Sequence, residues 1–218
     1  MDRVELDGEA GLRITTVPGV GPGYGHEVVR TGVGWSVAAT AAERAEPRPG
    51  DQVVDSPTVV MDRAFSVPVA PDLVWPWLMQ LGKRRAGWYL PRGVERFLPA
   101  GRRAVRHLDD RWQDLRVGSV IPDYGGRDET FTVLDVDAPR HLVYGSQRGR
   151  THLTWSITLR PIPATAGTRI LMRLRLAPVT HVWLARTAGE AVDVLTIAGL
   201  RRGLLERLGT PDTPETAR

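Results

Sequence analysis

The fold of this chain is decided by one stretch, Val67-Pro-Val-Ala-Pro-Asp-Leu-Val-Trp-Pro-Trp-Leu-Met-Gln-Leu-Gly-Lys-Arg-Arg-Ala-Gly-Trp-Tyr89. Pro71 suits the first position of a helix, where its missing N–H is not needed. Asp72 places a carboxylate at the positive end of the helix dipole. We expect Gly82 to end the helix as a left-handed cap. One apolar face of this helix is predicted to hold Val74, Trp77, Leu78 and Leu81.

Pro76 and the cations after Gly82 modify this helix. Pro76 lacks a donor and crowds the preceding turn, so it should kink the helix or move its start. Lys83, Arg84 and Arg85 are placed to complement the negative end of the helix dipole. We expect the two arginine pairs, Arg84-Arg85 and Arg102-Arg103, to be solvated. The alternative is that they contact an anionic membrane or partner.

The composition is that of a soluble globular protein, with 218 residues, 42% hydrophobic and 25% charged. We expect a cytoplasmic protein, since there is no apolar run long enough to span a bilayer and no apolar signal core. The absence of cysteine excludes disulfides, thiolate metal sites and a cysteine nucleophile. The 29 basic and 25 acidic residues are interspersed, which argues against nucleic-acid binding.

Three regions are expected along the chain. Residues 1–34 form a Gly/Pro-rich arm, and the lysine and hydroxyl that a phosphate-binding loop needs are missing after its glycines, so we predict an irregular segment. A domain should cover 35–208, opening with a short helix over Trp35–Glu46 and a turn at 49–51. Residues 209–218 should form a tail.

The period of the apolar residues predicts one strand, then helices, then a run of strands. The first strand is expected over Thr58–Val69. A second helical region is expected over Leu90–Arg106, interrupted by prolines, with Val94, Phe97 and Leu98 on one apolar side. Short turn-rich connections then indicate an antiparallel meander. Its five strands are predicted over residues 118–124, 129–136, 141–147, 151–161 and 168–177.

Alternation assigns the two faces of the meander. In the fourth of its strands Leu153, Trp155, Ile157 and Leu159 share one face. The opposite face carries Thr154, Ser156, Thr158 and Arg160, and the next strand adds Arg169, Arg173 and Arg175 to it. We therefore predict one apolar face and one solvated face.

A long helix should close the domain, from about His181 or Ala188 to Leu208, with Gly209 as its stop. Gly199 and Gly203 fall away from its apolar arc and lower helix propensity, so we expect close packing or a bend there. The arc toward the sheet is predicted to hold Val194, Ile197, Leu200, Leu204, Leu205 and Leu208.

Several of these segments together carry a resemblance to a known superfamily. They are Val-x-Ala-Pro-x-x-Val-Trp-x-Trp-Leu at 67–78 with the following Gln-Leu-Gly and Ala-Gly-Trp-Tyr, and residues 112–119, 139–143, 154–156 and 167–169. The chain resembles the START-like, helix-grip proteins (SRPBCC), in particular the polyketide cyclase/dehydrase and lipid-transport group, over about 35–208. The resemblance implies an α+β helix-grip fold. In it a curved antiparallel sheet, made of one strand, two short helices and a meander of five strands, wraps on the long C-terminal helix.

A space between sheet and helix is the expected ligand site. We predict Trp77, Trp88, Tyr89, Phe131, Tyr144 and Trp155 at its wall, with plain core packing as the alternative for each. The Tyr89 and Tyr144 hydroxyls need partners if buried and are catalytic candidates together with Arg201. Asp193, Ile197 and Arg201 lie on or beside the helix arc and complete the predicted ligand-binding set. The alternatives are a snorkelling arginine and an aspartate that serves the helix dipole.

Stronger catalytic motifs are absent from the sequence. It contains no Gly-x-Ser-x-Gly, His-Glu-x-x-His or Walker loop, and its five histidines are far apart, so we predict no metal and no cofactor. The resemblance implies binding of a hydrophobic small molecule, with a cyclase, dehydratase or aromatase that uses cofactor-free acid/base chemistry as one possibility. The alternatives are a non-catalytic carrier or sensor of a lipid or quinone, and a regulatory protein that binds a partner. No stable insertion into a membrane is expected.

Overall fold

The computed structural model describes residues 37–163, 165–180, 182–184, 187 and 189–209. Of the two units into which the chain divides, 1–32 and 33–218, every described residue belongs to the second. The predicted arm over residues 1–34 and the tail from residue 210 onward lie outside the described residues, as does Trp35.

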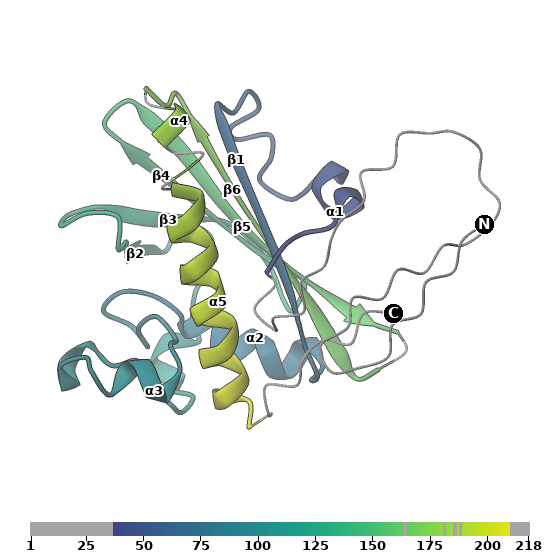
Figure 1. Cartoon of the computed structure of the whole chain (residues 1–218), viewed down its shortest axis with the longest axis vertical. Coiled ribbons are helices and arrows are strands. Elements are labelled where there is room, and N and C mark those ends of the chain that lie inside the picture. Colours follow the sequence, from purple (N-terminus) through teal and green to yellow (C-terminus); the bar gives the residue numbers. More distant parts are fainter. Residues whose placement is uncertain (1–36, 164, 181, 185–186, 188, 210–218) are drawn as a thin grey trace, which may run out of the picture. The chain divides into compact units, whose positions relative to one another are not determined.

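A six-stranded antiparallel sheet forms the body of the second unit, in the order β1-β6-β5-β4-β3-β2 (Figure 1). All six predicted strands are confirmed, each within a few residues of its expected ends. The strands are β1 (Val59–Val67), β2 (Val120–Pro122), β3 (Thr130–Asp137), β4 (His141–Arg148), β5 (Thr151–Ile162) and β6 (Gly167–Ala177). With the long C-terminal helix, this arrangement is the helix-grip fold.

Short helices and one long helix complete the unit. The α-helices are α1 (Ala41–Ala45), α2 (Pro71–Gln80), α3 (Arg92–Glu95), α4 (Val182–Leu184) and α5 (Glu190–Arg207), and two 3-10 turns cover Ala100–Arg102 and Asp110–Trp112. The predicted long helix is confirmed as α5, and Gly209 follows it with φ +70. Within the described part of the chain, every helix is too short or too polar to cross a membrane.

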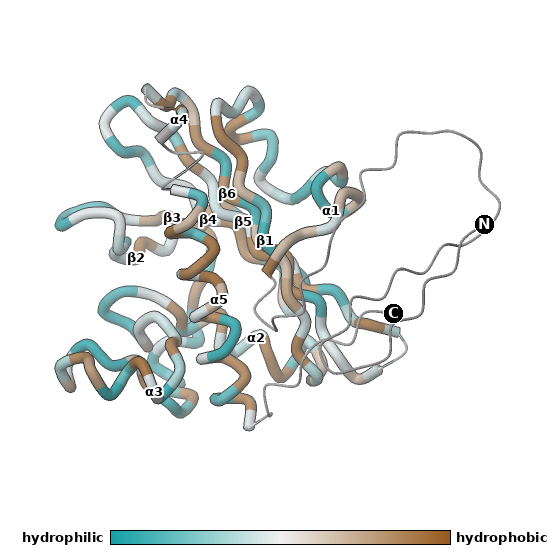
Figure 2. Tube along the Cα trace, viewed as in Figure 1, coloured by the Kyte–Doolittle hydropathy of each residue, from teal (hydrophilic) through white to brown (hydrophobic). Residues whose placement is uncertain are grey.

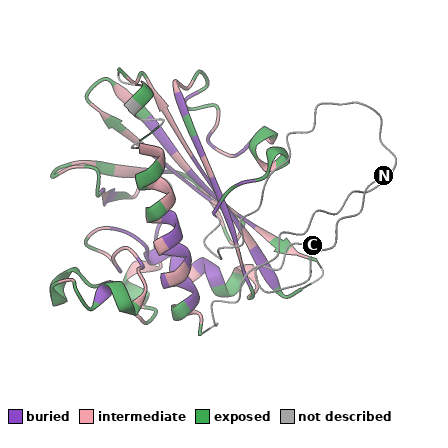
Figure 3. Cartoon of the chain, in the orientation of Figure 1, coloured by how far each residue is buried: buried purple, intermediate pink, exposed green. Residues whose placement is uncertain are grey.

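The hydrophobic core lies between one face of the sheet, α2 and α5. Alternation predicted this face correctly, since Ile157 and Leu159 of β5 pack with Ile170 and Met172 of β6 in one cluster. The lower half of α5 in Figure 3 is the buried half. It contributes Ile197, Leu200, Leu204 and Leu205 to the same cluster.

Helix α2 begins at Pro71 and continues through Pro76, so Pro76 does not move its start. The predicted cap at Gly82 is present only in part, since Gly82 has a positive φ (+142) but does not hydrogen-bond back to the helix. Leu81 ends the helix in an extended conformation, and Gly82 instead exchanges two backbone hydrogen bonds with Gly87. This bridge closes a tight turn whose last residue leads directly into Trp88.

The cations in this turn were predicted only in part. Arg85 does complement α2, because its Nη2 donates to the Met79 carbonyl at 3.1 Å, but it is half-buried and not solvated. Lys83 reaches away from α2 and donates to the carbonyls of Asp123 (2.8 Å) and Gly126 (2.7 Å). Arg84 is exposed, as expected.

The face of the sheet opposite α5 was predicted to be solvated, and it is not. Thr154 and Ser156 of β5 are only 1% and 3% exposed, because residues 37–55 cover them. In this segment the predicted helix is confirmed only over α1, since Ala38 is extended and pairs with β1. The predicted turn at 49–51 is present. A Cβ at Gly50 would lie 2.5 Å from Val143 Cγ1, so the turn rests directly on the sheet.

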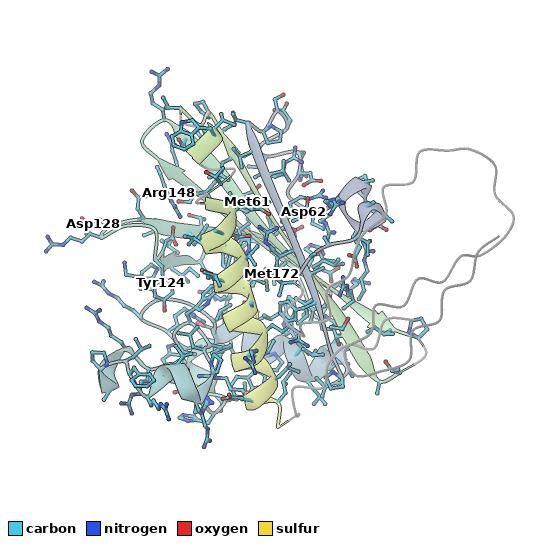
Figure 4. The ribbon with its side chains drawn as sticks, viewed as in Figure 1. Met61, Asp62, Tyr124, Asp128, Arg148 and Met172 are labelled. Carbon is cyan, nitrogen blue, oxygen red and sulfur yellow. The ribbon has the colours of Figure 1, made fainter. Side chains whose placement is uncertain are left out.

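Arginines from β5 and β6 hold this covering segment in place. Arg173 is 4% exposed, and its guanidinium bonds Asp62 at 2.7 Å and Asp51 at 2.8 Å (Asp62 is labelled in Figure 4). Its neighbours extend the pattern through Arg160–Glu46, Arg169–Glu43 and Arg175–Asp51 ion pairs. The arginines that alternation places away from the core therefore bind a second layer instead of water.

The region between residues 90 and 106 also departs from the prediction. It contains two single turns, broken at Pro99, and its apolar side faces outward, with Phe97 76% exposed and Val94 48% exposed. Glu95 faces inward and is 4% exposed, because Arg207 of α5 reaches it at 2.6 Å and neutralises it. Pairing with this buried arginine decides which side of α3 is inside.

Helix α5 is buried on a second side, which carries Gly199 and Gly203 and lies away from its apolar arc. A Cβ at Gly203 would lie 2.5 Å from the Tyr89 carbonyl carbon and 2.6 Å from the Leu90 nitrogen. At Gly199 it would lie 2.8 Å from Leu90 Cδ2. Close packing at these glycines is therefore confirmed, and only residues without a side chain allow the backbone at 89–90 to approach the helix.

Replacing Gly203 tests this contact. We expect Gly203→Ala to lower the free energy of unfolding by about 1–3 kcal/mol, because the atoms that it meets belong to the backbone and cannot rotate away. Gly93→Ala is the matched control, since nothing lies within 4 Å of its Cβ and the residue is helical. The control should be neutral or stabilising by up to about 1 kcal/mol. Urea unfolding measures both, and equal stabilities of the two variants would contradict the proposed close contact.

The covering segment predicts a dependence of stability on pH. Partial burial raises the pKa of Glu43, but hydrogen bonds from Arg169 and Thr40 outweigh it and lower this pKa to about 2. Because the folded pKa lies below the unfolded value of 4.5, the stabilisation is complete above pH 4.5 and is lost as the pH falls toward 2.

We therefore expect Glu43→Gln to destabilise the protein by about 1–2 kcal/mol at neutral pH and to flatten its stability profile between about pH 4.5 and 2. Glutamine still allows the capping box with Thr40, so the loss reports the charge. Asp128→Asn, at an exposed position (labelled in Figure 4), is the control and should follow the wild type. Parallel curves for wild type and Glu43→Gln would contradict this assignment.

Candidate functional site

Five aromatic rings gather on the α5 side of the sheet and form what we call the ring cluster, composed of Trp88, Tyr124, Phe131, Tyr144 and Trp155. Tyr144 of β4 lies opposite Trp155 of β5 in the strand register, and their rings stack with centroids 5.6 Å apart. Phe131 of β3 lies 5.6 Å from Tyr144 and 6.1 Å from Trp155. Paired strands therefore build most of this cluster.

The remaining rings come from loops and connect the cluster to α5. Trp88 lies 6.0 Å from Trp155, and its Nε1 donates to the Thr196 carbonyl in the middle of α5 at 3.3 Å. Tyr124 packs edge-on against Trp88 at 6.2 Å and is 53% exposed. Figure 4 labels Tyr124 together with Arg148, whose guanidinium lies 5.9 Å from the Phe131 ring. The cluster thus passes from a buried end at Tyr144 to an exposed end at Tyr124.

Tyr144 gives the buried end of the cluster its polar group. The residue is 1% exposed, and within the described part of the chain its hydroxyl makes no hydrogen bond to protein. Burial raises its pKa strongly, and the nearby Arg85 guanidinium opposes this only in part. The hydroxyl therefore stays protonated at neutral pH as a buried donor available to a ligand.

Arg85 adds a second polar group near Tyr144. Its Nη2 donates to the carbonyls of Trp112 (2.6 Å) and Met79 (3.1 Å), which fixes the guanidinium in place. Its Nε is buried and has no partner among the described residues. Desolvation by burial lowers the pKa of Arg85, but an arginine stays charged at neutral pH. The two groups supply one neutral and one cationic donor.

Tyr89, the other candidate tyrosine, is committed to the structure. Its hydroxyl donates to the Trp77 carbonyl at 2.8 Å, and its ring packs edge-on against Trp77 with centroids 5.8 Å apart. Arg207 covers the ring at 4.5 Å. Burial raises the pKa of Tyr89, although hydrogen bonding and the nearby arginines oppose this. The structure thus places Trp77 and Tyr89 together. Among the described residues, neither ring packs against a ring of the ring cluster.

The candidates on α5 lie in two environments. Asp193 makes an ion pair with Arg63 of β1 at 2.7 Å, and Glu190 meets the same guanidinium at 2.8 Å. Burial raises the pKa of Asp193 despite the opposing charge of Arg63. Ile197 and Arg201 are 3% and 4% exposed in the buried half of the helix.

Sequence reasoning missed three residues of this region, Arg63, Arg85 and Tyr124. Arg63 has the parity of Phe65 and Val67, so alternation alone could have placed it on the face toward α5. Arg85 was interpreted as solvated, and no sequence signal separates it from Arg84. Tyr124 ends a predicted strand, but its approach to Trp88 depends on how two loops fold. Among the described residues, no group of three or more His, Asp or Glu side chains is placed to hold a metal ion.

No family model and no curated protein matches the chain. Among solved structures, CalU16 from Micromonospora echinospora is 17% identical over 69% of this chain and 83% of that protein, with a TM-score of 0.40. Protein MLL2253 from Mesorhizobium loti is 14% identical over 69% and 97%, with a TM-score of 0.44. The Aha1 dimer from Colwellia psychrerythraea is 12% identical over 66% and 96%, with a TM-score of 0.38. Similarities of this size carry no inference about function.

Replacing each of the two tyrosines by phenylalanine distinguishes a structural hydroxyl from one without a protein partner. We expect Tyr89→Phe to destabilise the protein by about 1 kcal/mol, because the Trp77 carbonyl loses its buried donor. Tyr144→Phe removes a hydroxyl without a protein partner and should leave the stability of the ligand-free protein unchanged or slightly increased. Urea unfolding of both variants measures this, and an equal loss in the two would show that Tyr144 also holds a structural hydrogen bond.

Proposed function

We propose that this protein binds a flat hydrophobic small molecule between the sheet and α5, with an oxygen atom of the ligand against the Tyr144 hydroxyl. The observation that carries this proposal is the buried hydroxyl without a protein partner at the inner end of five clustered rings. Leaving such a donor unpaired in an apolar surrounding is unfavourable, and a ligand oxygen would remove the penalty. On this proposal the chain belongs to the START-like superfamily that its sequence resembles.

The shape and chemistry of the ligand follow from the residues around this hydroxyl. Trp155 and Phe131 present ring faces and edges, which suit a planar conjugated molecule better than a flexible chain. Arg85 favours a carbonyl, enolate or carboxylate oxygen over an ether or an amine. A polyketide-like or quinone-like compound has both properties.

Two activities use the same ligand pose. In a cyclase or dehydratase, the Tyr144 hydroxyl and the Arg85 guanidinium would both donate to a carbonyl oxygen of the ligand and stabilise the negative charge that develops on it, without a cofactor. In a carrier or sensor, the same two groups would only hold the ligand. We favour binding as the common function, and turnover of the bound compound separates the two activities.

A regulatory protein that acts through a partner is the second candidate. It is favoured by the exposed apolar side chains of α4 and the first turns of α5, where Trp183, Val192 and Leu195 are 70%, 63% and 68% exposed. Exposed apolar residues of this size often mark protein contacts. If the purified protein binds no small molecule, this second candidate function would be favoured.

Native mass spectrometry of the purified protein, followed by extraction under denaturing conditions, tests the proposal first. We then expect planar aromatic ketones and quinones to raise the melting temperature of the wild type. Tyr144→Phe should weaken binding about tenfold, since one hydrogen bond to a charged or polarised oxygen is lost. Tyr89→Phe is the matched control, because it removes a hydroxyl from the same core whose hydrogen bond goes to the Trp77 carbonyl. Equal affinities of Tyr144→Phe and the wild type for every compound that binds would overturn the proposed pose.

A further inference from the structure

An exposed segment of unusual composition follows Trp88 in the sequence. Residues 92–103, which we call the 92–103 surface, contain α3 and the 3-10 turn at 100–102. Figure 3 shows α3 as exposed, and Figure 2 shows hydrophilic and hydrophobic residues mixed along it. Every residue of the segment except Glu95 and Leu98 is exposed.

The 92–103 surface is cationic. Arg92, Arg96, Arg102 and Arg103 are all exposed, and Glu95 is the single carboxylate of the segment. Glu95 contributes no negative charge to the surface, because it is buried and paired with Arg207 at 2.6 Å and Arg106 at 3.2 Å. The segment therefore presents positive charge without an exposed carboxylate of its own.

The same surface is also apolar. Phe97 is 76% exposed and Val94 is 48% exposed, although both had the spacing of core residues. The Arg96 guanidinium lies 4.6 Å from the centre of the Phe97 ring, so one face of the ring is already covered by a cation. Exposed arginines in the same segment as a protruding aromatic ring match the boundary between lipid headgroups and acyl chains.

We propose that the 92–103 surface docks on a bilayer that contains anionic lipids, with Phe97 and Val94 entering the headgroup region and the arginines contacting lipid phosphates. The charge selects an anionic surface, and the exposed Phe97 and Val94 favour a bilayer over nucleic acid, because apolar side chains gain free energy by entering the headgroup region. Trp88 lies four residues before this surface, so docking would bring the ring cluster near the bilayer. The proposal rests on exposure and charge and does not require that a ligand binds.

Co-sedimentation with phosphatidylglycerol-containing vesicles and with pure phosphatidylcholine vesicles tests the proposal. We expect binding only to the former, with a loss at high salt. Arg92→Gln/Arg102→Gln should weaken it about 25-fold, since each arginine near an anionic surface contributes about fivefold. Arg127→Gln/Arg150→Gln removes the same charge at exposed positions elsewhere and should bind almost as the wild type does. These four side chains are all exposed, so the folded state should be unaffected, which urea unfolding checks.

Phe97→Ser and Leu195→Ser separate the apolar contribution from charge. Both residues are highly exposed, at 76% and 68%, but only Phe97 belongs to the 92–103 surface. We expect Phe97→Ser alone to weaken vesicle binding. Absence of vesicle binding by the wild type, or equal losses in the two arginine doubles, would overturn the proposal. Binding to a DNA oligonucleotide can be measured by fluorescence anisotropy. The proposal would also be overturned if Arg92→Gln/Arg102→Gln weakened DNA binding but left vesicle binding unchanged.

Discussion

The approach of α5 to the backbone at Tyr89 and Leu90 is the constraint on which much of this structure depends. Gly203 allows the two backbones to meet, and one turn later Arg207 donates to the carbonyls of Leu90 (3.2 Å) and Val105 (2.9 Å). A long helix thereby fixes the chain on both sides of α3, at Leu90 and at Val105. Trp88, Glu95 and the exposed α3 turn take their positions from this contact.

The sheet has a different kind of layer on each of its faces. Toward α5 the contact is apolar and aromatic, and buried polar groups such as Arg63 and Tyr144 are few. Toward α1 the contact is ionic, and each buried arginine meets carboxylates or backbone carbonyls, as Arg173 does. Burying charges in this way adds little net stability but penalises any other arrangement strongly, because breaking a pair leaves an uncompensated charge.

The sequence predicted what depends on local periodicity. All six strands, the start of α2 and the end of α5 follow from alternation, helical spacing and the positions of Pro71 and Gly209. Alternation cannot say what covers a face, so it predicts Thr154 and Arg173 to be solvated, whereas both are buried. Helical spacing also failed at α3, where a long-range pair between Glu95 and Arg207 outweighs the apolar pattern of Val94 and Phe97. Of the site residues, the meander brings Phe131, Tyr144 and Trp155 together, whereas the position of Arg85 depends on a turn that the sequence did not specify.

The extended residues before α1 have a consequence for the outer edge of the sheet. Val37 accepts a hydrogen bond from the Ala64 N–H at 2.9 Å, and Ala38 pairs with Arg63, so β1 has backbone groups that are already occupied in its middle. At the other edge, β2 is three residues long and ends in Pro122, which has no N–H to offer. Neither border is a good template for another strand, so copies of this protein are protected from the edge-to-edge association through which open sheets aggregate.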